Sequence, residues 1–157
     1  MVFPVWTLCF LIGCVAGLRA LMAPAIICAA AYLGWLHLGG TPLGFLDHKV
    51  TLAIFTILAI GELVVDKLPS TPPRTDPPAL IARIVMGALA GAAMAVGRGA
   101  GLVMGALLGA VAAGVVAFAG YYIRRGLVKQ TKLPDAAVAV LEDLLTISGG
   151  LFVVSRL

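Results

Sequence analysis

The chain has 157 residues, of which 62% are hydrophobic and 11% are charged. Ordinary soluble domains are about 45–50% apolar and about 25% charged. This composition excludes a water-soluble globular enzyme, a disordered tail and a secreted disulfide scaffold. It predicts an all-α integral membrane protein that forms one membrane domain over residues 1–157.

The formal net charge of +4 does not indicate a nucleic-acid partner, because the basic residues lie at the ends of apolar runs and form no solvated face. The three cysteines, Cys9, Cys14 and Cys28, lie inside apolar stretches at spacings that match no zinc or redox signature. No Lys or Arg precedes the first apolar run, which disfavours a signal peptide. The sequence predicts no metal and no cofactor, and the expected surrounding is a lipid bilayer.

Six apolar segments follow one another along the chain, at residues 2–18, 20–38, 50–66, 79–97, 101–123 and 134–155. The first two are separated only by Arg19, and a single helix over both would be about 55 Å long. Since the hydrocarbon core is about 30 Å thick, the chain must turn near Arg19 and, by the same argument, near Arg98. Each pair of arms either crosses the membrane fully or forms a re-entrant hairpin with an arginine at its tip.

Three longer breaks are predicted loops, at residues 37–49, 67–78 and 124–134. The last two carry most of the Lys and Arg residues outside the apolar segments. By the positive-inside rule, loops 67–78 and 124–134 are therefore expected to be cytoplasmic. With six segments and a turn at Arg19, both the C-terminus and the N-terminus are then expected outside.

The sequence also suggests an internal repeat. Arg19 and Arg98 lie about half the chain apart, and nearly the same offset places Glu62 on Glu142. Each half contains three segments, an odd number, so the halves would have opposite orientation. We therefore predict two inverted repeats, residues 1–78 and 79–157, an arrangement that recurs in secondary transporters.

Two carboxylates lie deep inside predicted membrane segments. Glu62 is about 20 Å along its segment from Lys49, and Glu142 is about 12 Å from Pro134. An ionised carboxylate at such depth costs several kcal/mol unless it is paired, hydrated or protonated. Each has an acidic neighbour: Asp66 shares a helical face with Glu62, and Asp143 follows Glu142 but points about 100° away from it.

Two interpretations of these charges remain open. In the functional one, Glu62 and Glu142 line a polar path and bind a proton or a cation, with Arg19 and Arg98 as counter-charges or anion ligands. In the structural one, Arg19 pairs with Glu62, and Arg98 or Arg125 pairs with Glu142, so that fixed ion pairs lock helices together. We favour the functional interpretation for the two glutamates, because buried ion pairs are a costly way to hold helices together.

A row of glycines, Gly97, Gly101, Gly105 and Gly109, recurs every four residues. Such rows let helix backbones approach closely, either across a dimer face or in a seam within one chain. Six short segments offer little protein in which to bury two acidic residues. We therefore expect a homodimer.

Three groups of residues carry a family resemblance: Gly17-Leu18-Arg19-Ala20 with Pro24, then Glu62 to Pro69, then Leu141-Glu142-Asp143. Together they resemble the bacterial membrane family called domain of unknown function 4126, from about residue 13 to residue 150. The chain departs from that family in its very basic segment 124–132 and its glycine-dense middle. The resemblance implies a small inner-membrane protein without an established activity, and it supplies no catalytic residues. It singles out Arg19, Glu62, Asp66, Lys67, Glu142 and Asp143.

The first functional prediction is a small secondary transporter or channel-like protein for a small ion or small molecule, with Glu62 and Glu142 as proton or cation sites. The alternative is a non-transporting membrane scaffold, or a protein that binds anionic lipid or polyprenyl phosphate through its basic loops. An enzyme is not expected, because the sequence offers no nucleophile–base pair, no histidine cluster and no phosphate loop.

Overall fold

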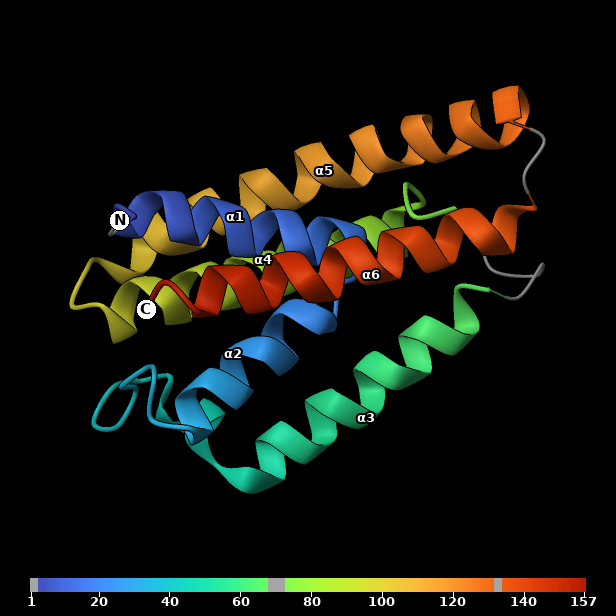
Figure 1. Cartoon of the computed structure of the whole chain (residues 1–157). Coiled ribbons are helices and arrows are strands. Elements are labelled where there is room, and N and C mark those ends of the chain that lie inside the picture. Colours follow the sequence, from blue (N-terminus) through green and yellow to red (C-terminus); the bar gives the residue numbers. More distant parts are fainter. Residues whose placement is uncertain (1–2, 68–72, 132–133) are drawn as a thin grey trace.

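The computed structural model describes residues 3–67, 73–131 and 134–157, and these residues form six α-helices and one short 3₁₀ helix (Figure 1). The prediction of an all-helical chain is confirmed, and each predicted segment corresponds to one helix. Helices α4, α5 and α6 are long and apolar enough to cross a membrane. The elements are α1 (Val5–Leu18), α2 (Met22–Tyr32), η1 (Gly44–Asp47), α3 (Lys49–Val65), α4 (Pro77–Gly97), α5 (Leu102–Thr131) and α6 (Asp135–Val154).

The first two helices form a short hairpin. Helix α1 has 14 residues and α2 has 11, which correspond to about 21 Å and about 16 Å of helix. The predicted turn at Arg19 is confirmed, since the backbone of Arg19 is extended and α2 begins at Met22. The tip of the hairpin lies part-way along α5 and α6, not at their ends (Figure 1).

The centre of the bundle is a close three-way contact among α1, α4 and α5, made possible by small residues. A Cβ atom on Gly91 of α4 would lie 3.0 Å from the Cα atom of Gly109 on α5. A Cβ atom on Gly13 of α1 would lie 2.7 Å from the same atom. Two members of the predicted glycine row, Gly105 and Gly109, therefore serve a seam within the chain. Of the other two, Gly97 contacts Leu36, whereas Gly101 has no such neighbour within 4 Å.

The prediction of a loop at residues 124–134 is wrong over most of its length. Helix α5 continues to Thr131 and has 30 residues, or about 45 Å. Arg, Leu, Lys and Gln in this stretch are good helix formers, and no proline occurs before Pro134. The basic residues Arg124, Arg125 and Lys129 therefore extend from the last turns of a helix, while Lys132 lies outside the described residues.

The outer faces of the helices are apolar. On α5, Val103, Leu107, Val111 and Val115 are each more than half exposed. Helix α3 buries only Ala59 and presents a row of exposed aliphatic side chains. Large exposed apolar surfaces of this kind are stable against lipid and not against water. The start of α1, the end of α6 and the α4–α5 turn lie at one end of the bundle, opposite the end of α3, the end of α5 and the start of α6 (Figure 1).

Candidate functional site

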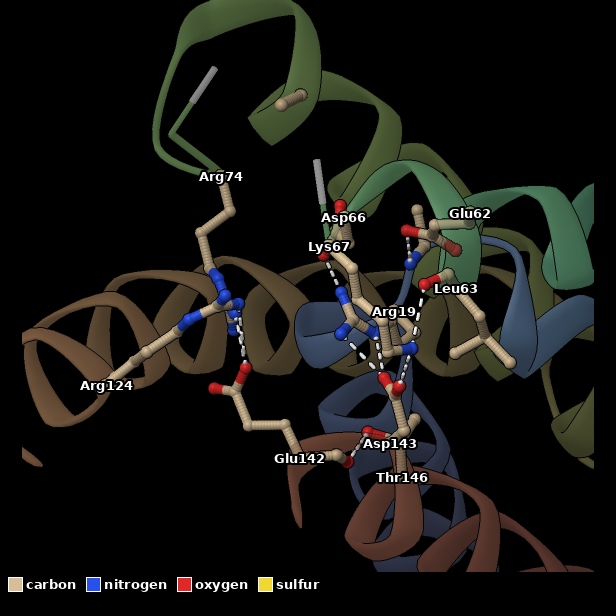
Figure 2. Close-up of polar contacts among 12 residues, drawn as sticks. Arg19, Glu62, Leu63, Asp66, Lys67, Arg74, Arg124, Glu142, Asp143 and Thr146 are labelled. Carbon is tan, nitrogen blue, oxygen red and sulfur yellow. Dashed lines mark hydrogen bonds and ion pairs between the residues drawn. The ribbon is translucent and has the colours of Figure 1, made fainter. Parts of the chain in front are cut away.

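Ten charged side chains meet around the tip of the α1–α2 hairpin and form what we call the polar network. Figure 2 labels all of them except Arg83 and Asp135. The ten side chains come from the α1–α2 turn, from α3, α4, α5 and α6, and from the segments that follow α3 and precede α4. Five of the chain's seven acidic residues belong to it. The network consists of Arg19, Glu62, Asp66, Lys67, Arg74, Arg83, Arg124, Asp135, Glu142 and Asp143.

Arg19 is the innermost charge, with 1% of its side chain exposed. Its Nε atom donates a 2.7 Å hydrogen bond to Oδ1 of Asp143, and its Nη1 atom pairs with Asp66. Lys67 approaches Asp143 from the end of α3, with Nζ 2.6 Å from Oδ2. Two carboxylates and two cations thus neutralise one another where the hairpin, α3 and α6 meet.

Glu62 holds the backbone of the hairpin tip. Its two carboxylate oxygens each accept a 2.8 Å hydrogen bond, one from the N–H group of Ala20 and one from that of Leu21. These N–H groups precede α2 and have no partner within the helix, so the carboxylate satisfies them. Its negative charge also interacts favourably with the positive N-terminal end of the dipole of α2. Arg83 of α4 lies farther away, with Nη2 3.9 Å from Oε1 of Glu62.

Glu142 lies between two arginines. Its Oε2 atom accepts a 2.7 Å hydrogen bond from Nη2 of Arg74 and a 3.3 Å hydrogen bond from Nη1 of Arg124. Arg124 also forms a two-point contact with Asp135 at the start of α6. Thr146 donates to the backbone carbonyl of Glu142 and fixes the local helix.

Three buried guanidinium groups have donors without a hydrogen-bond partner among the described residues. Nη1 and Nη2 of Arg19 are still in ion-pair contact with Asp66 and Asp143, whereas two other donors have neither kind of partner. They are Nη1 of Arg74 and Nε of Arg83, on side chains that are only 5% and 6% exposed. Arg74 fits here because Gly120 of α5 has no side chain: a Cβ atom there would lie 2.9 Å from Nη1. A buried N–H group without an acceptor costs free energy in the folded state, so each of these two donors requires an explanation.

The network carries no net charge when all its members are ionised, since it contains five cations and five anions. Its exposure increases from Arg19 outward to Asp135, whose side chain is 62% exposed. The arrangement can exchange ion-pair partners or take up a proton together with an anion. Within residues 3–67, 73–131 and 134–157, no three His, Cys, Asp or Glu side chains are grouped to hold a metal ion.

Five of the six predicted site residues meet in the network, and one does not. Arg98 lies at the opposite end of the bundle, where its Nη1 atom donates to the backbone oxygen of Leu157. The ion pairs named in the structural interpretation are not the ones that the structure shows. Arg19 pairs with Asp66 and Asp143 and not with Glu62, because the free N–H groups at the hairpin tip occupy both oxygens of Glu62.

Glu142 likewise pairs with Arg74 and Arg124, and neither Arg98 nor Arg125 takes part. Five network members were not among the predicted site residues: Lys67, which only the family resemblance singled out, and Arg74, Arg83, Arg124 and Asp135. Arg83 had a weak signal, because it lies about 6 Å inside the predicted apolar segment 79–97, about half the depth of Glu142. Arg74 had none, since it follows a proline-rich connection that gives no register.

A comparison with known protein families shows to which family the chain is related. Residues 7–155 match the family described as Domain of unknown function (DUF4126). The chain belongs to this family. A search of curated proteins and a search of solved structures each gave no match. Membership of DUF4126 establishes common ancestry with the other proteins of that family.

Proposed function

We propose that this DUF4126 protein is a small secondary transporter of the bacterial inner membrane, with the polar network as its substrate-binding region. The observation that supports this is the position of Arg19, a buried arginine at the tip of a hairpin whose arms are shorter than the hydrocarbon core. Interrupted helices that carry ionisable groups to partial depth are typical of secondary transporters.

Glu142 is the carboxylate that best fits a coupling role. Its two cationic partners, Arg74 and Arg124, come from different parts of the chain and compete for the same oxygen. Protonation of Glu142 would release both arginines at once. Glu62 instead holds the backbone of the hairpin tip, so a proton or cation at Glu62 would act by loosening the hairpin.

Flux measurements test the proposal directly. Wild type and Glu142→Gln are reconstituted in liposomes that contain a pH-sensitive dye, and gradients of a panel of cations and anions are imposed. Asp76→Asn is the matched control, because Asp76 is a carboxylate outside the network, at the start of α4. We expect at least one gradient to move protons through wild type and the control, and none through folded Glu142→Gln. Absence of proton movement in folded wild type for every gradient contradicts transport.

A membrane scaffold is the second candidate. It is supported by the complete pairing of the five carboxylates, each of which has a cationic or backbone donor. A scaffold predicts that Glu62→Gln and Glu142→Gln melt at lower temperature, with no stabilisation of wild type by any cation or proton concentration. Melting curves across pH and a cation panel separate it from a transporter, because a ligand that binds only the folded state raises its stability.

The inverted repeat, the membrane orientation and the homodimer belong to the same proposal. Three helices in each half support the repeat, and so do the opposite directions in which the Arg19 and Arg98 turns face (Figure 1). The basic ends of α3 and α5 support a cytoplasmic location for that end of the bundle. The exposed aliphatic face of α3 is the surface we assign to a second copy, and light scattering of the purified protein tests it.

A further inference from the structure

The charge balance of the polar network limits which ligands it can accept. The network is neutral when fully ionised, and an uncompensated charge at this depth is expensive. A bound cation would add a positive charge to carboxylates that already have donors. A bound anion can be balanced by protonating one carboxylate. Neutrality therefore favours an anion that enters with a proton.

The unused donors indicate the same class of ligand. Nη1 of Arg74 and Nε of Arg83 are buried N–H groups that lack acceptors in the described part of the chain. Coulombic interactions link Arg83 to both Arg74 and Glu142, so the two guanidinium groups share one region of the network. An N–H donor can be satisfied only by an acceptor, and guanidinium groups fit phosphate-like and carboxylate oxygens particularly well.

We propose that the network binds a singly charged oxyanion together with one proton, at the position now held by the carboxylate of Glu142. The proton binds a carboxylate oxygen of Glu142, which then no longer attracts Arg74 and Arg124. The oxyanion accepts their N–H groups, including the unused Nη1 of Arg74. No other bond forms or breaks, and the net charge stays constant. This site rests on the proposed function in one respect: it names the substrate class of the transporter.

The pH dependence of the site follows from the groups that face Glu142. Arg74 precedes α4, Arg124 belongs to α5 and Asp135 acts through Arg124. Arg83 of α4 contributes a further positive charge nearby. An incoming anion can take the place of the Glu142 carboxylate beside these cations once that carboxylate binds a proton. Anion binding and proton binding therefore strengthen each other.

The oxyanion has two possible sources, and the structure provides for both. An apolar groove of about 210 Å³ lies beside the network between α1 and α6. Leu18 and Thr146, which line it, adjoin the network residues Arg19 and Glu142. A lipid whose phosphate binds the network would place its acyl chain in this groove. When a small dissolved anion binds instead, the groove would be filled by acyl chains of the surrounding bilayer.

Calorimetric titration of the full-length protein in detergent tests the proposal. One arm uses methanesulfonate and the other uses short-chain phosphatidylglycerol, since both are singly charged tetrahedral oxyanions that do not titrate near neutral pH. Each titration is repeated in two buffers of different ionisation enthalpy to count protons. We expect wild type to take up one proton with each anion bound. Binding with uptake of one proton in either arm supports the proposal and identifies the source.

Variants locate the site. Arg74→Gln is expected to weaken anion binding by about 10-fold or more, the effect of losing a hydrogen bond to a charged group. Gly120→Ala, whose Cβ would lie 2.9 Å from Nη1 of Arg74, should also weaken it without removing a charge. Gly126→Ala is its control on the same helix, with no such neighbour within 4 Å. Glu142→Gln should bind the anion without proton uptake.

Several results would overturn the proposal: no binding in either arm, binding without proton uptake in wild type, or full affinity in both Arg74→Gln and Gly120→Ala. Failure of the site and failure of transport are distinguishable. Proton-coupled flux of cations with no oxyanion binding rejects the site and keeps the transporter. Proton-coupled oxyanion binding with no flux of any ion in liposomes keeps the site and rejects transport.

Discussion

Arg19 and Asp143 lie 124 positions apart in the sequence, yet Nε of Arg19 is 2.7 Å from Oδ1 of Asp143. This hydrogen bond joins the tip of the first hairpin to the middle of the last helix. Both side chains are at least nine-tenths buried. The pair therefore fixes the position of α1 and α2 against α6. No loop connects this hairpin directly to α6.

Removing the charge of Asp143 should lower the free energy of unfolding of the bundle. Asp143→Asn leaves Arg19 buried with one charged partner fewer, and breaking a buried pair costs about 3–5 kcal/mol. The matched control is Asp135→Asn, which removes an exposed carboxylate of the same helix and should cost about 1 kcal/mol or less. Denaturant unfolding in detergent micelles measures both. Equal losses would mean that burial of the Arg19 pair contributes nothing special.

Loss of Glu62 should release the hairpin tip locally. Glu62→Ala leaves the N–H groups of Ala20 and Leu21 without their acceptors. Hydrogen exchange at these two amides should accelerate at least about 10-fold, the change that corresponds to about 1.4 kcal/mol of lost protection. Exchange at the Arg98 turn, far from Glu62, serves as the internal control. Unchanged exchange at the hairpin tip would contradict this role.

The glycine row should divide into essential and tolerant positions. Gly109→Ala places a methyl group against the backbone of Gly87 and should destabilise the fold by about 1–3 kcal/mol through overpacking. Gly101→Ala is the control from the same row, since nothing lies within 4 Å of its added Cβ. Melting temperatures report stability, and light scattering reports the oligomeric state. A change of oligomeric state in Gly109→Ala without loss of stability would move this glycine to a dimer face.

The three thiols should differ in reactivity. Cys9 and Cys28 are fully buried, whereas Cys14 lines the groove between α1 and α6. N-ethylmaleimide, followed by mass spectrometry of the detergent-solubilised protein, should modify Cys14 first. Cys14→Ala should leave a protein that reacts only as fast as it unfolds. Early modification of Cys9 or Cys28 would show that the α1 and α2 packing opens readily.

The orientation of the bundle gives a further test. Single cysteines at Thr41 and Ala100 in a variant without native thiols should be labelled from one side of the membrane, and a cysteine at Thr75 from the other. The reason is that the α2–α3 connection and the α4–α5 turn share one end of the bundle (Figure 1). A membrane-impermeant maleimide applied to vesicles of opposite orientation makes the measurement. Labelling of all three from one side contradicts a membrane-spanning bundle in this orientation.

The sequence predicts the helices well because a membrane protein must satisfy its backbone groups within helices, so apolar length and breaks identify them. The turn at Arg19 followed from length alone, as did the turn at Arg98. The end of α5 did not follow, since a basic stretch outside the hydrocarbon layer carries no hydrophobic signal to separate helix from loop. Its continuation to Thr131 depends on good helix formers and on the contacts of Arg124 with α6.

The charged residues of the site were easier to find than their partners. Depth within an apolar segment singled out Glu62 and Glu142. A charged side chain at that depth costs free energy and is therefore expected to have a specific role. Pairing is a property of how helices rotate and approach, which one sequence does not contain. Arg98 shows the difference: it matches Arg19 in its local sequence setting, yet it contacts the backbone oxygen of Leu157 and not the acidic side chains of the network.

The separation of Arg19 and Asp143 has a consequence for biosynthesis. The hairpin is synthesised long before α6. Asp143, the partner of Arg19, is therefore absent until most of the chain has been translated. Until then Asp66 is the one carboxylate partner of Arg19 that has already been made, and the donors that later bind Asp143 must be solvated by lipid phosphates or by water entering from one side. The hairpin should therefore settle to its final depth last, even though it is made first.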